Sequence, residues 1–152
     1  MGLLQTVMFA AMLAGCAAQN PQQAPEVMTV VQPAPWSVNY SDGSGNLTRF
    51  WQESGGQGVQ FSYDPVQPHE SSSGTYSGGE PSKGALTTQQ AEELWQHAHA
   101  LQSNSVLHAA SRMKGTGAFD LTTPEGKSSF VIANSAELKA FNTFVQSLVR
   151  SK

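Results

Sequence analysis

The chain has 152 residues, enough for one domain with its own hydrophobic core. Only 12% of the residues are charged, against a usual ~25%, and the net charge is −3 without blocks of like charge. This composition offers no basic stripe for phosphates and argues against nucleic-acid binding. Cys16 is the single cysteine, so no disulfide can form within the chain.

The N-terminal segment predicts an export signal. Residues 3–14 carry no charge and are mostly apolar, but they are too few to cross a bilayer, which takes about 20 such residues. They are therefore expected to form the apolar core of a signal peptide. The segment ends in Leu13-Ala14-Gly15-Cys16, which resembles the lipobox of bacterial lipoproteins.

The lipobox resemblance implies a lipid anchor at Cys16. In that family the preceding residues, here 1–15, are removed and the new N-terminal cysteine is acylated, and two or more acyl chains anchor a protein stably. Ala17 is similar to the outer-membrane sorting signal of enterobacterial lipoproteins. The expected location is thus the bacterial cell envelope, at the outer membrane facing the periplasm. Residues 2–5 depart from the family because they contain no Lys or Arg, and an ordinary cleaved signal peptide is the alternative.

Residues 16–35 predict the lipidated cysteine followed by a tether. The segment holds four prolines among Gln, Ala and Val, with Glu26 as its only charge, a composition typical of an extended and solvated chain. As an alternative, residues 27–31 add an edge strand to the domain. Residues 36–152 then form a single domain.

The first half of this domain predicts an antiparallel meander. Residues 36–40, 47–52 and 59–63 alternate between apolar and polar side chains, and glycine-rich turns separate them. Residues 72–77 are expected to pair as a fourth strand, closed by two glycines.

The second half predicts two helices with a hairpin between them. Thr87 can cap the first helix while Gln90 reaches back to the cap. Its apolar face holds Ala91, Leu94, Trp95, Ala98 and Leu101. Residues 119–121 and 128–133 alternate as a hairpin, and Asn134 or Ser135 can cap the last helix. The apolar stripe of that helix holds Leu138, Phe141, Val145, Leu148 and Val149.

This order of elements predicts an α+β fold. We expect a two-layer sandwich in which an antiparallel sheet of about five to six strands is covered on one face by two amphipathic helices. Phe50 and Trp51 are adjacent in a strand, so they must point to opposite faces, and one of them lies away from the helices. Trp51, Phe50 and Tyr76 form the candidate partner surface. The alternative is that residues 66–84 shield the outward ring.

Histidine spacing does not favour a metal site. His97 and His99 lie two positions apart on a helix and therefore point about 200° apart. Glu93 and His97 form an i,i+4 pair, which is expected to be an ordinary surface pair because zinc would need further ligands. No metal ligand is assigned.

Motifs for covalent or nucleotide chemistry are also absent from the sequence. Ser77 lies among glycines but lacks the G-x-S-x-G spacing of a nucleophile elbow. In residues 79–84 the glycines are five apart, yet Ala85 stands where a P-loop has lysine and Pro81 removes an amide. We therefore assign no catalytic residue, no cofactor and no nucleotide.

The predicted function is that of a non-enzymatic, lipid-anchored binding or accessory protein. It would attach to the membrane through acylated Cys16 and dock an envelope protein through the outward sheet face or an edge strand. The alternative is a small-ligand-binding or hydrolytic periplasmic protein with a cleft beneath residues 66–84, near Ser77, His69 or His108. A third hypothesis is inhibition of another envelope enzyme by the glycine-rich loop.

Overall fold

The computed structural model describes residues 34–55 and 58–150. The expected signal peptide, Cys16 and residues 27–31 lie outside the described residues. The elements in chain order are β1 (Trp36–Ser41), β2 (Leu47–Gln52), β3 (Val59–Asp64), β4 (Ser82–Leu86), α1 (Thr88–Ser103), the 3₁₀ turn η1 (Ser105–Leu107), β5 (Gly117–Thr123), β6 (Gly126–Ile132) and α2 (Ala136–Arg150).

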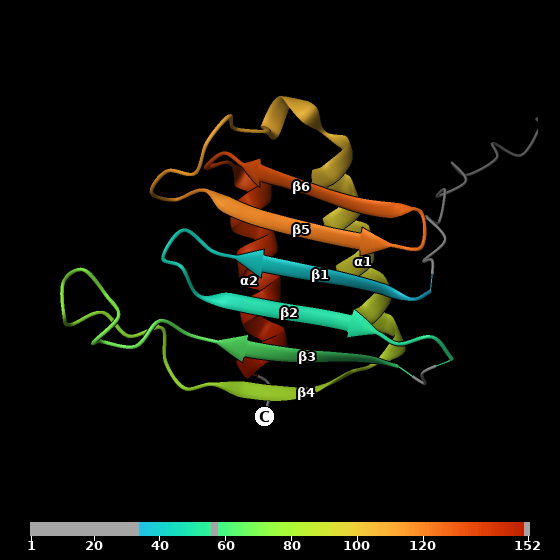
Figure 1. The fold of residues 1–152 in the computed structure, drawn as a ribbon, viewed down its shortest axis with the longest axis horizontal. Helices are drawn as coiled ribbons and strands as arrows, with labels where there is room; N and C mark the ends of the chain where they lie inside the picture. Colours follow the sequence, from blue (N-terminus) through green and yellow to red (C-terminus); the bar gives the residue numbers. More distant parts are fainter. Residues whose placement is uncertain (1–33, 56–57, 151–152) are drawn as a thin grey trace, which may run out of the picture.

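The six strands form one antiparallel sheet in the order β4-β3-β2-β1-β5-β6. Figure 1 shows α1 and α2 side by side behind this sheet, while the face toward the viewer carries no helix formed by residues 34–55 or 58–150. The predicted α+β class, with two helices on one face, is confirmed. Among the described residues, neither helix combines the length and the apolar character needed to cross a bilayer.

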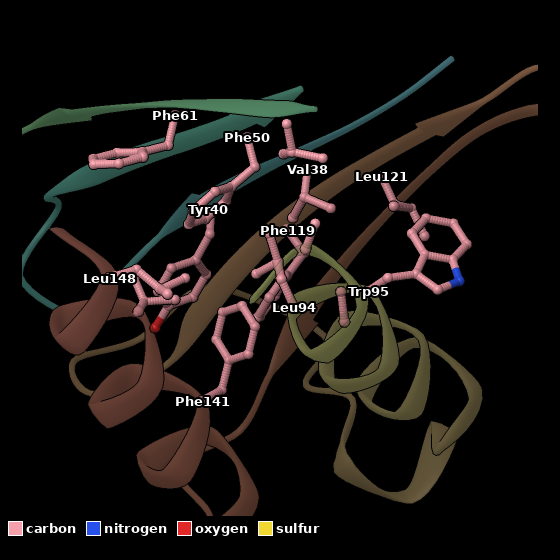
Figure 2. Close-up of a cluster of buried hydrophobic side chains, with 14 of the residues drawn as sticks. Val38, Tyr40, Phe50, Phe61, Leu94, Trp95, Phe119, Leu121, Phe141 and Leu148 are labelled. Atoms are coloured by element: carbon pink, nitrogen blue, oxygen red, sulfur yellow. The ribbon is translucent and has the colours of Figure 1, made fainter. Parts of the chain in front are cut away.

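Strand parity sorts the side chains between the two faces of the sheet. Val38 lies opposite Phe50 across the β1–β2 pair, and both are fully buried. Ser37 lies opposite Trp51 in the next row, on the other face. Figure 2 shows Val38, Phe50 and their neighbours filling the space between the sheet and the helices. The core formed by the described residues therefore lies between the sheet and the two helices.

The helices bury the predicted stripes. All ten apolar positions predicted for the two helices are buried. The capping box is present at α1, where Thr87 Oγ1 accepts a hydrogen bond from the Gln90 N–H (3.2 Å) and Gln90 Oε1 accepts one from the Thr87 N–H (2.9 Å). At α2 the cap is Ser135, whose hydroxyl accepts from the Leu138 N–H at 3.2 Å.

The fourth strand was predicted at the wrong place. Residues 72–77 form turns and irregular chain, whereas β4 begins at Ser82. The Ser73 hydroxyl accepts hydrogen bonds from the backbone N–H groups of Thr75 and Tyr76, and such local bonds compete with a strand ladder. Leu86, which is buried, instead fixes β4 against the core.

Candidate functional site

The helix-free face of the sheet carries the first candidate site. Leu47, Arg49 and Trp51 alternate along β2 and share this face, and Arg49 is exposed while Trp51 is half-buried. Phe50 points the other way and is 0% exposed, so its place in the candidate partner surface was wrong. The reason is that the helices pack on the Phe50 side and take that ring into the core.

Trp51 lines a shallow apolar hollow of about 350 Å³. Its walls include Pro35, Trp36 and Pro124, at the end of the sheet where β1 begins. No residue of the 66–84 segment lines it, and Figure 1 shows the loop before β4 at the other end of the sheet, beyond the start of β2 and the end of β3. The loop therefore does not shield Trp51.

Tyr76 belongs to a different site from Trp51. It is 37% exposed, lies in the loop between β3 and β4, and its hydroxyl accepts a hydrogen bond from Asn46 Nδ2 at 2.9 Å. Asn46 precedes β2, whereas Trp51 lies near the end of that strand. The candidate surface predicted from sequence is thus separated into Trp51 on the helix-free face, Tyr76 at the other end of the sheet, and Phe50 in the core.

The second candidate site is a polar cleft of about 620 Å³ at the end of the sheet where β1 finishes. The alternative from the sequence was a cleft beneath residues 66–84, near Ser77, His69 or His108. Ser77 is among the residues that line the observed cleft. His69 and His108 are not among its lining residues. The cleft is lined by Asp42, Gly43, Ser44, Asn46, Tyr63, Tyr76, Ser77, Gly78, Lys114, Gly115, Asn134, Asn142, Gln146 and Arg150.

Asn46 holds the loop wall of this cleft in place. Its side chain is buried, and its Nδ2 donates to Asp42 Oδ2 (2.7 Å) and to the Tyr76 hydroxyl. Its Oδ1 accepts from the Val66 N–H at 3.0 Å. A Cβ on Gly78 would lie 2.0 Å from this Oδ1, so only glycine lets the loop approach so closely. One amide therefore joins the β1–β2 turn to the loop before β4.

Helix α2 supplies the opposite wall. Asn142, Gln146 and Arg150 recur every four residues and therefore lie on one face of the helix. The Tyr40 hydroxyl donates to Asn142 Oδ1. Burial, aided by the Asp42 charge, raises the pKa of Tyr40 far above its ordinary value, which keeps this hydroxyl protonated as a donor. This contact uses the oxygen of the Asn142 amide and leaves its Nδ2 group as a hydrogen-bond donor.

Tyr63 closes the floor of the cleft. Its hydroxyl donates to the Gly78 carbonyl at 2.8 Å. Burial raises the pKa of Tyr63, and a hydrogen bond with Gln146 opposes part of the shift. The hydroxyl therefore remains a neutral donor at physiological pH, and Tyr63 ties the loop to the sheet.

Two cationic side chains and one carboxylate line the cleft, those of Lys114, Arg150 and Asp42. The Asp42 carboxylate accepts hydrogen bonds from Ser44 N–H (2.8 Å), Asn46 N–H (3.0 Å) and Asn46 Nδ2. Lys114 and Arg150 form no salt bridge with another described residue. The carboxylate is thus occupied by the turn that it stabilises, while the two cations remain available to a ligand.

The histidines take structural or surface positions. Glu93 and His97 form the predicted surface pair, with Oε1 and Nε2 4.0 Å apart. The His108 ring stacks on Phe130 at 5.2 Å, and its Nε2 is 3.0 Å from the Leu101 carbonyl oxygen. Within residues 34–55 and 58–150, no group of three or more His, Cys, Asp and Glu side chains could hold a metal ion.

No protein-family model matches this chain, and no curated protein is detectably similar to it in sequence. The geometry of the two sites is therefore the basis for inferring function. Most of the cleft was not predicted from the sequence, including Asn142, Gln146 and Lys114. The four-residue spacing on α2 is visible in the sequence, but Lys114 comes from the loop between η1 and β5, and only folding brings it to α2.

Proposed function

We propose that this protein is a lipid-anchored, non-enzymatic binding protein of the bacterial cell envelope, and that it docks a partner protein on the helix-free face of its sheet. One observation carries the docking site: Trp51 and Arg49 lie two residues apart on the same face of β2, which neither helix of the described residues covers. Trp and Arg are among the residues that contribute most to protein interfaces.

The composition of the helix-free face supports docking at this point. Antiparallel sheets commonly leave one face in water, and polar side chains are expected there. The neighbours of Trp51 in its own row across the sheet follow that rule, since Ser37, Gln60 and Thr122 are polar. Trp51 departs from it and rests in an apolar hollow beside Pro35 and Pro124. A partner side chain in this hollow would remove the exposed part of the indole from water.

Arg49 indicates the chemistry of the partner. It forms no salt bridge with a described residue, whereas Asp120, in the same row across β1, is paired with Lys127 at 3.5 Å. The partner we infer presents a carboxylate to Arg49 and a flat apolar or proline side chain to Trp51. Pro35 lines the Trp51 hollow, so the partner would bind beside the junction of the domain with the proposed tether.

The lipid anchor predicts a direct chemical result. In cells fed a labelled fatty acid, the full chain is expected to carry the label, and the Cys16→Ala variant is expected to carry none, because acylation needs the thiol. The variant should also move from the membrane fraction to the soluble fraction. The proposed anchor would be contradicted if the Cys16→Ala protein carried the label. It would also be contradicted if the cell removed residues 1–15 of the wild-type protein and the remaining chain carried no label.

The docking site predicts that Trp51→Ala and Arg49→Ala each weaken binding of the partner without unfolding the domain. The anchored chain is cross-linked in cells, the partner is identified by mass spectrometry, and binding is then measured with purified components. We expect each variant to weaken binding by at least about tenfold, the effect of losing one hot-spot residue.

Glu92→Ala is the matched control for the docking experiment. Glu92 is exposed on α1, on the other side of the molecule, and its loss should leave partner binding unchanged. Circular dichroism must show the same fold for all three variants. If Trp51→Ala and Arg49→Ala bind the purified partner as tightly as the wild type, the proposed surface is wrong.

A further inference from the structure

We propose that the polar cleft is a second binding site, which takes an acidic saccharide. This inference is independent of docking through Trp51. The cleft lies where β1 ends and the Trp51 hollow lies where β1 begins, so each site can be changed without touching the other. Its ligand class follows from the size, the hydrogen-bonding groups and the charges of the lining residues.

The size of the cleft suits a small molecule. Its volume of about 620 Å³ is within the range of small-molecule sites, about 300–1,000 Å³. Such sites are mostly apolar, but most residues that line this one have polar side chains, including Asn134, Asn142 and Gln146 on the side of α2. A ligand that fills it must therefore offer hydrogen-bonding groups as well as apolar surface.

Amides and tyrosines in one cleft favour a hydroxyl-rich ligand. A primary amide donates through its NH₂ and accepts through its oxygen, so neighbouring amides can both accept from and donate to hydroxyl groups. Asn142 is already oriented by Tyr40, whose hydroxyl occupies its Oδ1. Tyr76, which is 37% exposed, adds aromatic surface beside these groups. Sugar rings combine hydroxyl edges with apolar C–H faces and fit both kinds of group.

The charges indicate that the saccharide is acidic. Lys114 and Arg150 reach the cleft from two different segments without a salt-bridge partner among the described residues. The Asp42 carboxylate is occupied by three N–H donors of its own turn. Carboxylates on the ligand would gain charge-assisted hydrogen bonds from these cations, and such bonds are stronger than bonds between neutral groups.

The test is isothermal titration calorimetry on the purified full chain with two disaccharides that differ in charge. Digalacturonate carries two carboxylates, and galactobiose is its neutral counterpart. We expect digalacturonate to bind at least about tenfold more tightly, because each charged hydrogen bond changes affinity by that order. Equal affinity for the two sugars, or no binding of digalacturonate, would overturn the proposal.

Two charge-removing variants locate the site. Lys114→Gln and Arg150→Gln should each weaken digalacturonate binding by about tenfold and leave any weak galactobiose binding unchanged. Lys139→Gln is the matched control, because Lys139 is an exposed cation of α2 outside the cleft lining. Loss of affinity in Lys139→Gln equal to that in Lys114→Gln would point to the overall charge of the protein and would overturn the proposal.

Two further measurements distinguish a saccharide site from a simple anion site and from the docking surface. Inorganic phosphate titrated alone should bind more weakly than digalacturonate, and equally tight binding would show a simple anion site and overturn the proposal. Trp51→Ala should bind digalacturonate with the affinity of the wild type. Lys114→Gln should bind the partner protein with the affinity of the wild type. The proposed docking function can then fail while the saccharide site stands, and the reverse also holds.

Discussion

Phe141→Ala is expected to lower the free energy of unfolding by about 3–5 kcal/mol, as truncation of a buried aromatic side chain usually does. Phe141 is 0% exposed and lies at the contact of α2 with the sheet. Its ring meets Tyr40 edge-on at 4.9 Å and Phe119 at 5.1 Å (Figure 2). Alanine would leave a cavity between the two layers, and urea unfolding followed by circular dichroism measures the loss.

Phe144→Ala is the matched control on the same helix. Phe144 is only partly buried and packs at the edge of the core against His97, with ring centroids 5.1 Å apart. The same truncation should therefore cost clearly less than at Phe141, because the site is open to water and leaves no closed cavity. Equal losses at the two positions would show that the core is not centred on Phe141.

Asn46→Ala is expected to lower the free energy of unfolding by about 1–3 kcal/mol, the cost of leaving buried polar groups without partners. The change removes the partner of the Val66 N–H and of the Tyr76 hydroxyl. The loop between β3 and β4 should then separate from the β1–β2 turn. Hydrogen exchange at Val66 and Gly78 is expected to accelerate, while exchange in the centre of β1 stays slow.

Asn46→Asp tests the same contact through its pH dependence. The new carboxylate would face Asp42 Oδ2, which in the native protein lies 2.7 Å from the Asn46 amide nitrogen. Two carboxylates this close raise the folded-state pKa of the pair above its unfolded value. Stability relative to wild type should therefore rise as the pH falls from about 7 toward about 4, because a shared proton replaces the lost donor. A penalty that stays constant over this range would contradict the proposed contact.

Local patterns predicted most of the secondary structure correctly. The apolar spacing of both helices, the Thr87 cap and the alternation of the first three strands act between residues close in sequence, so the sequence alone carries them. The fourth strand was predicted at residues 72–77 and not at 82–86 because both segments lack a strong apolar alternation. There the contact of Leu86 with the core decides the pairing.

For the two candidate sites as well, the sequence determined some features and the tertiary structure decided the others. The sequence by itself determined that Phe50 and Trp51 point to opposite faces, because successive side chains of a strand alternate. Which of them meets water was decided only when α1 and α2 packed against the Phe50 side. The cleft depends on tertiary structure even more strongly. The residues that line it are far apart in sequence, as shown by Asp42, Ser77, Lys114 and Asn142. They meet at one end of the sheet because of the antiparallel order of the strands and the position of α2.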